Sequence, residues 1–167
     1  MIFRPAKIEC DGNPLRVYNL RCNVKAISWN LALVNLTADL IKPIRNPIVH
    51  LQVLKKDYAN QYKPFLIDVT FNICQVIERR NFLPYGVIMF KLLKRYSNIN
   101  HTCPYSGRLF MQNGYLDHDL LPPFPQGFYL FSCEFFDTNS TTKDYLGTAK
   151  FYVEVMEMVK SKKRPKA

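Results

Sequence analysis

Bulky apolar side chains alternate with small or polar ones along most of this chain. The clearest run is 64–74, where Phe65, Ile67, Val69, Phe71 and Ile73 fall on one side and Leu66, Asp68, Thr70, Asn72 and Cys74 on the other. A period of two residues is typical of a β-strand that packs one face on a core. We therefore predict a strand over this segment.

The same pattern, less regular, recurs before and after that segment. In 24–41, the large residues Ile27, Trp29, Leu31 and Leu33 alternate with small or polar ones and share one predicted face. Short strands separated by turn residues predict a mainly β fold, an antiparallel β-sandwich of two sheets. Further strands are predicted at 16–22, 48–56, 107–113, 127–136 and 146–159.

The period of the pattern changes to a helical one in a single segment, 84–96. Tyr85, Met89, Leu92 and Tyr96 recur at helical spacing, and neighbouring apolar residues widen the stripe. We predict one helical insert at about 84–96. Its broad apolar face suits either of two roles, the cap of a cavity mouth or the cover of a sheet edge.

The chain has 167 residues, which suits one domain. Of its net charge of +10, five positive charges lie in the last eight residues, and no negative charge is among them. We predict a single domain at 1–159 and a disordered basic tail at 160–167, because like charges repel and nothing apolar anchors them. No apolar run approaches the ~18 residues of a transmembrane helix.

Three N-glycosylation sequons indicate the secretory pathway. They begin at Asn35, Asn100 and Asn139, and such sites are used only in the secretory pathway, at the protein surface. The residues after Met1 lack the ~7–15-residue apolar region of a signal peptide. We therefore expect an extracellular, secreted protein whose leader is absent from this sequence.

The five cysteines are Cys10, Cys22, Cys74, Cys103 and Cys133, and none of them forms a Cys-x-x-Cys pair. In an oxidising compartment four would pair and one would remain, and their connectivity does not follow from sequence. The alternative is five buried thiols in a reducing compartment. No metal site or cofactor is predicted, because the zinc-ligand spacings are missing.

Three stretches carry a family resemblance. They are YKPFLIDVTFNIC, YSNINHTCPYSG and LPPFPQGFYLF, in that order between residues 62 and 131. The chain, from about Lys7 to Val155, resembles a family of insect secreted proteins of largely unassigned function that includes the CheB-type chemosensory proteins. It is similar in turn to the lipid-recognition (ML) domains, the group of the ganglioside activator protein.

The resemblance implies an immunoglobulin-like β-sandwich whose sheets part to hold a lipid or other small hydrophobic ligand. It also implies the disulfide pairs Cys10–Cys22 and Cys74–Cys103, and Cys133 departs from the family pattern. The function expected on this basis is non-enzymatic binding, with pheromone or hydrocarbon presentation as one form of it. A membrane receptor is a further candidate partner.

Candidate pocket residues are those that would face inward from opposed strands or from the predicted helix. An ordinary packed core gives the same alternation, so a dry structural or receptor-interaction module remains the alternative. The candidates are Trp29, Leu31, Leu33, Phe65, Ile67, Val69, Phe71, Met89, Leu92, Phe151 and Val153.

Two other classes of function have weaker support. A hydrolase is disfavoured because the histidines, His50, His101 and His118, belong to no recognisable triad and no Gly-x-Ser-x-Gly elbow is present. Nucleic-acid binding would suit a basic, aromatic-rich chain. The aromatic residues follow core periodicity instead, so no catalytic residue and no nucleic-acid partner is predicted.

Overall fold

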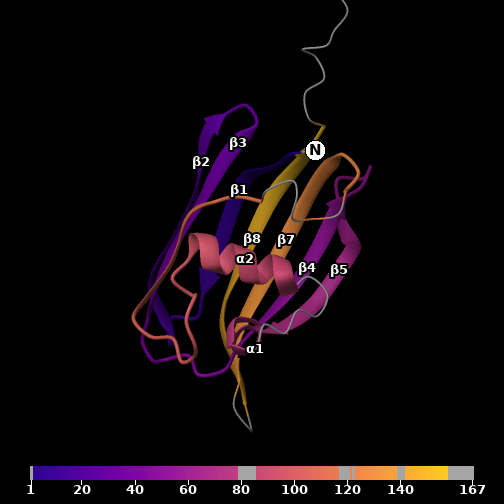
Figure 1. Ribbon diagram of the computed structural model, residues 1–167. Helices are drawn as coiled ribbons and strands as arrows, with labels where there is room; N and C mark the ends of the chain where they lie inside the picture. The colour runs from indigo at the N-terminus through magenta and orange to yellow at the C-terminus, as the bar shows by residue number, and fades with distance from the viewer. Residues whose placement is uncertain (1, 79–85, 117–120, 122, 139–141, 158–167) are drawn as a thin grey trace, which may run out of the picture.

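The computed structural model describes residues 2–78, 86–116, 121, 123–138 and 142–157. Two antiparallel sheets form a β-sandwich, which confirms the predicted fold class (Figure 1). The larger sheet has the order β1-β8-β7-β4-β5, and the smaller has the order β2-β3-β6. The strands are β1 (Ile2–Gly12), β2 (Val17–Ser28), β3 (Leu31–Leu40), β4 (Pro47–Lys56), β5 (Tyr62–Asn72), β6 (Arg108–Gly114), β7 (Gly127–Thr138) and β8 (Lys143–Met156).

Strand β1 was not predicted, because its alternation is interrupted. Its pairing with β8 shifts register between Pro5 and Lys7. Proline has no N–H to donate to a ladder, so it is tolerated on an edge strand or at such an irregularity. The shift leaves Ala6 and Lys7 both exposed, and this breaks the period of two on which the prediction depended.

The predicted strand 24–41 is wrong as a single element. Its first residues end β2, Trp29 and Asn30 form a tight turn, and the rest forms β3. The turn contains Asn30, a common turn residue, but the alternation of large and small residues continues through it, and this hid the chain reversal. The Ser28 hydroxyl donates a hydrogen bond to Oδ1 of Asn30, 2.8 Å away, across this turn.

Two helices follow β5, where one was predicted. The first, α1 (Ile73–Glu78), is short and buries Ile73 and Val76. The second, α2 (Gly86–Tyr96), is the predicted insert, and residues 84 and 85 lie outside the described residues. Among the described residues, no helix is long and apolar enough to cross a membrane.

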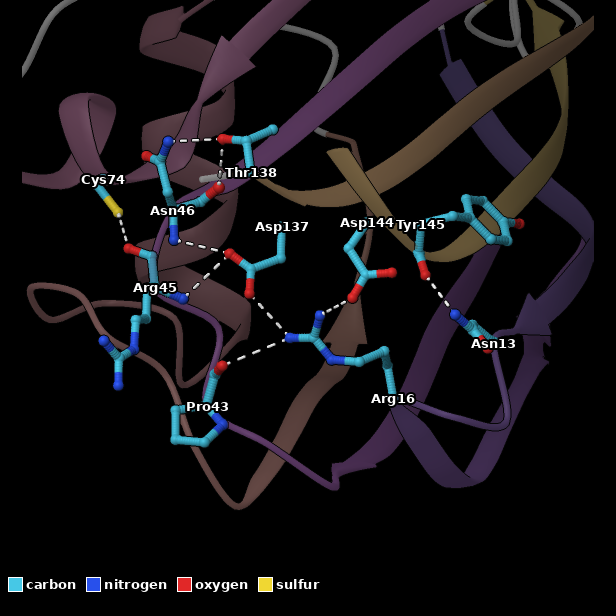
Figure 2. A network of polar contacts seen from close by, with 10 residues as sticks. All are labelled: Asn13, Arg16, Pro43, Arg45, Asn46, Cys74, Asp137, Thr138, Asp144 and Tyr145. Atoms are coloured by element: carbon cyan, nitrogen blue, oxygen red, sulfur yellow. Dashed lines mark hydrogen bonds and ion pairs between the residues drawn. The ribbon is translucent and has the colours of Figure 1, made fainter. Parts of the chain in front are cut away.

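One end of the sandwich is held by an ionic network around Arg16, which is only 5% exposed (Figure 2). Its guanidinium bonds to Asp144 and, at 2.8 Å, to Asp137. Asp137 also accepts a hydrogen bond of 3.0 Å from the backbone N–H of Asn46. The network thereby joins the β1–β2 turn, the β3–β4 connection and the β7–β8 hairpin.

The pKa of Asp137 reflects these contacts. Burial alone would raise it, but the hydrogen bond from Arg16, the backbone N–H groups of Asn46 and Arg45, and the Arg16 charge together hold it below its ordinary value. The carboxylate is therefore kept ionised in the folded protein.

Candidate ligand-binding cavity

An apolar cavity of about 310 Å³ lies between the two sheets and under α2. Its walls come from the inner faces of both sheets, from both helices and from the segment that follows α2. The atoms that line it are almost all apolar. Ligand pockets have volumes of about 300–1,000 Å³, so this cavity is large enough to hold a small molecule.

The five-stranded sheet shows directly that the interior is incompletely filled. Leu51 of β4, Cys133 and Phe135 of β7, and Phe151 of β8 all point inward and line the cavity. Each is nevertheless only partly buried. In a close-packed core such positions would have no accessible surface, so their remaining exposure is exposure to the cavity.

The three-stranded sheet supplies the opposite wall. On β3 the lining residues are Val34, Leu36, Ala38 and Leu40, which alternate with outward-facing positions. Ala38 leaves room that a larger side chain would fill. This small residue on the inner face is therefore part of why the cavity exists.

Helix α2 closes the space between the sheets. In Figure 1 it crosses in front of the strands of the larger sheet, and its apolar face lines the cavity with Ile88, Met89, Leu92, Leu93 and Tyr96. The cations of the helix, Lys91, Lys94 and Arg95, are exposed.

Gly114 of β6 lines the cavity beside the end of α2. A Cβ atom on Gly114 would lie 3.0 Å from Sδ of Met111, on the same strand, and 3.7 Å from Cβ of Tyr96, the last residue of α2. The first contact would require the flexible Met111 side chain to shift, and the second is an ordinary van der Waals contact. Gly114 therefore contributes a small residue to the cavity wall.

The structure divides the predicted pocket residues into three groups. Ile67, Met89, Leu92, Phe151 and Val153 line the cavity. Phe65, Val69 and Phe71 do not line it but pack into the core clusters beside it. Trp29, Leu31 and Leu33 were wrongly placed.

The error for those three residues follows from the β2–β3 hairpin. Trp29 lies in the turn and is 56% exposed. Leu31 and Leu33 occupy β3 positions that alternate with the lining residue Val34, so they face away from the cavity. The sequence pattern identified the alternation correctly but assigned the inner face to the wrong set of residues.

Several lining residues were missed, among them Val49, Tyr105 and Cys133. Val49 and Cys133 alternate regularly within predicted strands, so their inward direction could have been inferred from register with their neighbours. Tyr105 belongs to the segment between α2 and β6, where no periodicity indicates burial. Its position depends on its backbone pairing with Ile44.

Three hydroxyl groups at the cavity wall, those of Ser97, Tyr105 and Thr148, are already hydrogen-bonded. Ser97 donates to the carbonyl of Leu93 at 2.7 Å, and Tyr105 donates to the carbonyl of His101 at 2.8 Å. The hydroxyl of Thr148 is paired with that of Tyr145. Burial and the nearby charge of Glu78 raise the pKa of Tyr105 to about 12, so it stays protonated.

Two disulfides flank the cavity, with the pairing that the resemblance implies. Cys10–Cys22 joins β1 to β2, the edge strands of the two sheets. Cys74–Cys103 joins α1 to the segment after α2. In Figure 2, Sγ of Cys74 lies 3.7 Å from the carbonyl oxygen of Arg45, a contact only, because a disulfide sulfur has no proton to donate.

Cys133 is the remaining free cysteine, and all five cysteines are among the described residues. It lies on the inner face of β7 and lines the cavity. Burial raises the pKa of its thiol to about 12. The thiol is therefore a weak nucleophile at neutral pH.

The two described histidines that were considered for catalysis lie away from the cavity lining. His50 is on the outer face of the larger sheet, with Nε2 2.6 Å from Asp68 and Nδ1 3.2 Å from Glu134. The hydrogen bond with Asp68 raises the pKa of His50; burial opposes this and Glu134 adds to it. His101 bonds to the adjacent Thr102 carbonyl at 2.8 Å, and His118 lies outside the described residues.

The sequons have different environments. Asn100 is exposed in the segment after α2. Asn35 lies within β3 and not at its end, and its Oδ1 accepts a 3.0 Å hydrogen bond from the backbone of Asn113. Asn139 lies outside the described residues.

The fold and the cavity together define an antiparallel β-sandwich with an apolar internal cavity. A family model described as a protein of unknown function (DUF1091) matches residues 49–131, from β4 through both helices to β7. The chain is thus similar to this uncharacterised family over the part that contains α2. No curated protein matches the chain.

Proposed function

We propose that this protein binds a lipid or another small hydrophobic ligand, non-covalently, in the cavity between its sheets. The observation that carries the proposal is the apolar cavity of about 310 Å³. Transfer of apolar ligand surface out of water is worth about 25 cal/mol per Å². A ligand could therefore bind well there with few polar contacts.

The protein would act by solubilising and presenting its ligand. Once its apolar surface is enclosed by the protein, the ligand can diffuse through water as part of the complex. The shape of the cavity selects among ligands. Met89 suits such a wall, because its side chain is flexible and polarizable. No group of the protein needs to react for this function.

Secretion and glycosylation are part of the same proposal. Two disulfides support an oxidising compartment, where such bonds persist, and the exposure of Asn100 suits a glycan. The resemblance to CheB-type and ML-domain proteins supports a chemosensory role, in which the loaded protein meets a membrane receptor. The competing hypothesis is a structural module that has no ligand.

Cys133 provides the test, because it is a single free thiol on the cavity wall. We expect 1-decanol to slow its alkylation by N-ethylmaleimide. At a decanol concentration about 100 times Kd the ligand-free fraction falls roughly 100-fold, and the alkylation rate should fall with it. The rate is measured by mass spectrometry of intact, delipidated protein.

The matched control ligand is 1-propanol at the same concentration, which is too short to fill the cavity and should leave the rate unchanged. The guanidinium-unfolded protein should react at the same rate with and without decanol. If no concentration of decanol protects the folded thiol, the structural-module hypothesis is favoured and the binding proposal is wrong.

A further inference from the structure

The β2–β3 hairpin carries an exposed apolar tip that takes no part in the cavity. Trp29, in the turn, is 56% exposed, and Ile27 is 50% exposed. Ile27 is the extra residue of a β-bulge, which interrupts the pairing of β2 with β3 at this point, and bulges re-aim side chains. Leu31 and Leu33 continue the apolar surface along the outer face of β3. These four residues are called the apolar tip below.

Trp29 is not held by the rest of the protein. Within the described part of the chain, its indole has no aromatic or cationic neighbour, and its N–H has no hydrogen-bond partner. Indole combines an apolar ring system with one polar N–H, and it prefers the boundary between water and the apolar part of a membrane. An exposed cluster of apolar side chains marks a site of interaction, and this composition favours a lipid surface.

The apolar tip lies at the end of the sandwich that is remote from the Arg16 network. Strands β2 and β4 both begin beside that network and run away from it. The β2–β3 and β4–β5 turns therefore lie at the same end of the molecule, which is the upper end in Figure 1. The β4–β5 turn adds Tyr58, whose side chain is fully exposed.

The same end has more cations than acids. Its described cations are Arg4, Lys25, Lys55, Lys56 and Lys63, and its described acids are Asp57, Glu154 and Glu157. Strand β8 also ends here, and the sequence continues into residues 160–167, which carry five positive charges and no negative one. Each cation near an anionic lipid surface strengthens membrane binding about fivefold. The charge at this end is therefore complementary to anionic lipid.

We propose that this end of the protein docks on a membrane surface that contains anionic lipid. Trp29 and Ile27 enter the interfacial layer, and Lys25 stays at the level of the lipid headgroups. The docking surface goes beyond the proposed function and does not depend on it, because none of these three residues lines the cavity.

Trp29 itself reports the docking, because it is the only tryptophan in the chain. The protein is titrated with vesicles of equimolar phosphatidylcholine and phosphatidylglycerol, and separately with vesicles of phosphatidylcholine alone. We expect the mixed vesicles to shift the Trp29 emission to shorter wavelength. Phosphatidylcholine brominated on its acyl chains, added to the mixed vesicles, should quench the emission. Vesicles of phosphatidylcholine alone should cause no shift at the same lipid concentration.

Two isoleucines provide a matched pair of variants. Ile27 and Ile41 are 50% and 51% exposed, and Ile41 lies at the opposite end, where its backbone N–H donates to the carbonyl of Arg16 at 2.8 Å. Ile27→Ser should weaken binding to the mixed vesicles about 4- to 12-fold, because a half-exposed side chain gains about half of the full transfer free energy. Ile41→Ser should bind as wild type does. Sedimentation with the vesicles measures both, and far-UV circular dichroism confirms that both variants are folded.

The remaining outcomes overturn the inference. If the mixed vesicles leave the Trp29 emission unchanged, the apolar tip does not enter a membrane and is left for a protein partner. If Ile27→Ser and Ile41→Ser bind the vesicles equally well, the docking surface lies elsewhere. If phosphatidylcholine alone binds the protein as tightly as the mixed vesicles do, the part given to anionic lipid is wrong. None of these results affects ligand binding in the cavity, which the decanol experiment tests separately.

Discussion

Replacement of Arg16 by methionine is expected to lower the free energy of unfolding by about 3 kcal/mol, the low end of the range for breaking a buried ion pair. The substitution keeps most of the apolar stem but leaves Asp137, whose side chain is 15% exposed, without its cation. The second partner, Asp144, is 44% exposed and is partly stabilised by water, which favours the low end of that range. Urea unfolding, with the midpoint and slope fitted together, measures the loss.

Lys7→Met is the control for this prediction. Lys7 also pairs with a carboxylate, Glu9 at 3.1 Å, but both side chains are exposed, at 62% and 48%. Exposed ion pairs contribute about 0–1 kcal/mol, so this variant should remain close to wild type in stability. An Arg16→Met variant no less stable than Lys7→Met would contradict the role given to the network.

The effect of Arg16→Met should also depend on pH in a defined direction. The pKa of Asp137 is lowered in the folded protein, despite burial, by Arg16 and the backbone N–H groups of Asn46 and Arg45. Its stabilising contribution is therefore present above the unfolded pKa of about 3.9 and is lost as pH falls through the folded value. The difference between wild type and Arg16→Met should accordingly narrow in acid.

Replacement of Ala38 by phenylalanine is expected to weaken decanol binding by about 200-fold. Ala38 lies on β3 and points into the cavity, so a phenyl ring there takes up space that the ligand would occupy. Exclusion of about four methylene groups removes roughly 3 kcal/mol of binding free energy, which is that fold-change in Kd. Displacement of the apolar fluorophore N-phenyl-1-naphthylamine from delipidated protein measures it.

The same substitution should leave the protein folded. In a filled core an added ring would cost about 1–3 kcal/mol, but here it enters existing space. Leu33→Phe is the matched control, because Leu33 lies on the same strand and faces away from the cavity. This control should bind decanol as wild type does, and equal affinity in Ala38→Phe and Leu33→Phe would place the ligand elsewhere.

The sequence predicted the class of fold because its strands show a period of two. Phe65, Ile67, Val69 and Phe71 occupy β5 positions that alternate with more exposed ones, as their spacing indicated. The helix was predicted for the same kind of reason, since a broad apolar stripe needs a surface to cover. Patterns of this kind report which residues share a face.

The pattern does not indicate which face of a strand lies inside the sandwich. It also does not indicate whether the space between the sheets is filled by side chains. The alternation of large and small residues continues through the reversal at Trp29 and Asn30, so the inner face of β3 was assigned to Leu31 and Leu33. The cavity itself depends on the distance between two sheets and on small residues such as Ala38 and Gly114. Alternation is identical for a filled core and an underfilled one.

The most direct test of the central claim is a crystal structure of the delipidated protein soaked with 10-bromo-1-decanol. The bromine gives an anomalous signal that locates one end of the chain. The account predicts a single bromine peak inside the cavity, near Cys133 and Phe151. A cavity without bound ligand, or bromine found only on the outer surface, would contradict it.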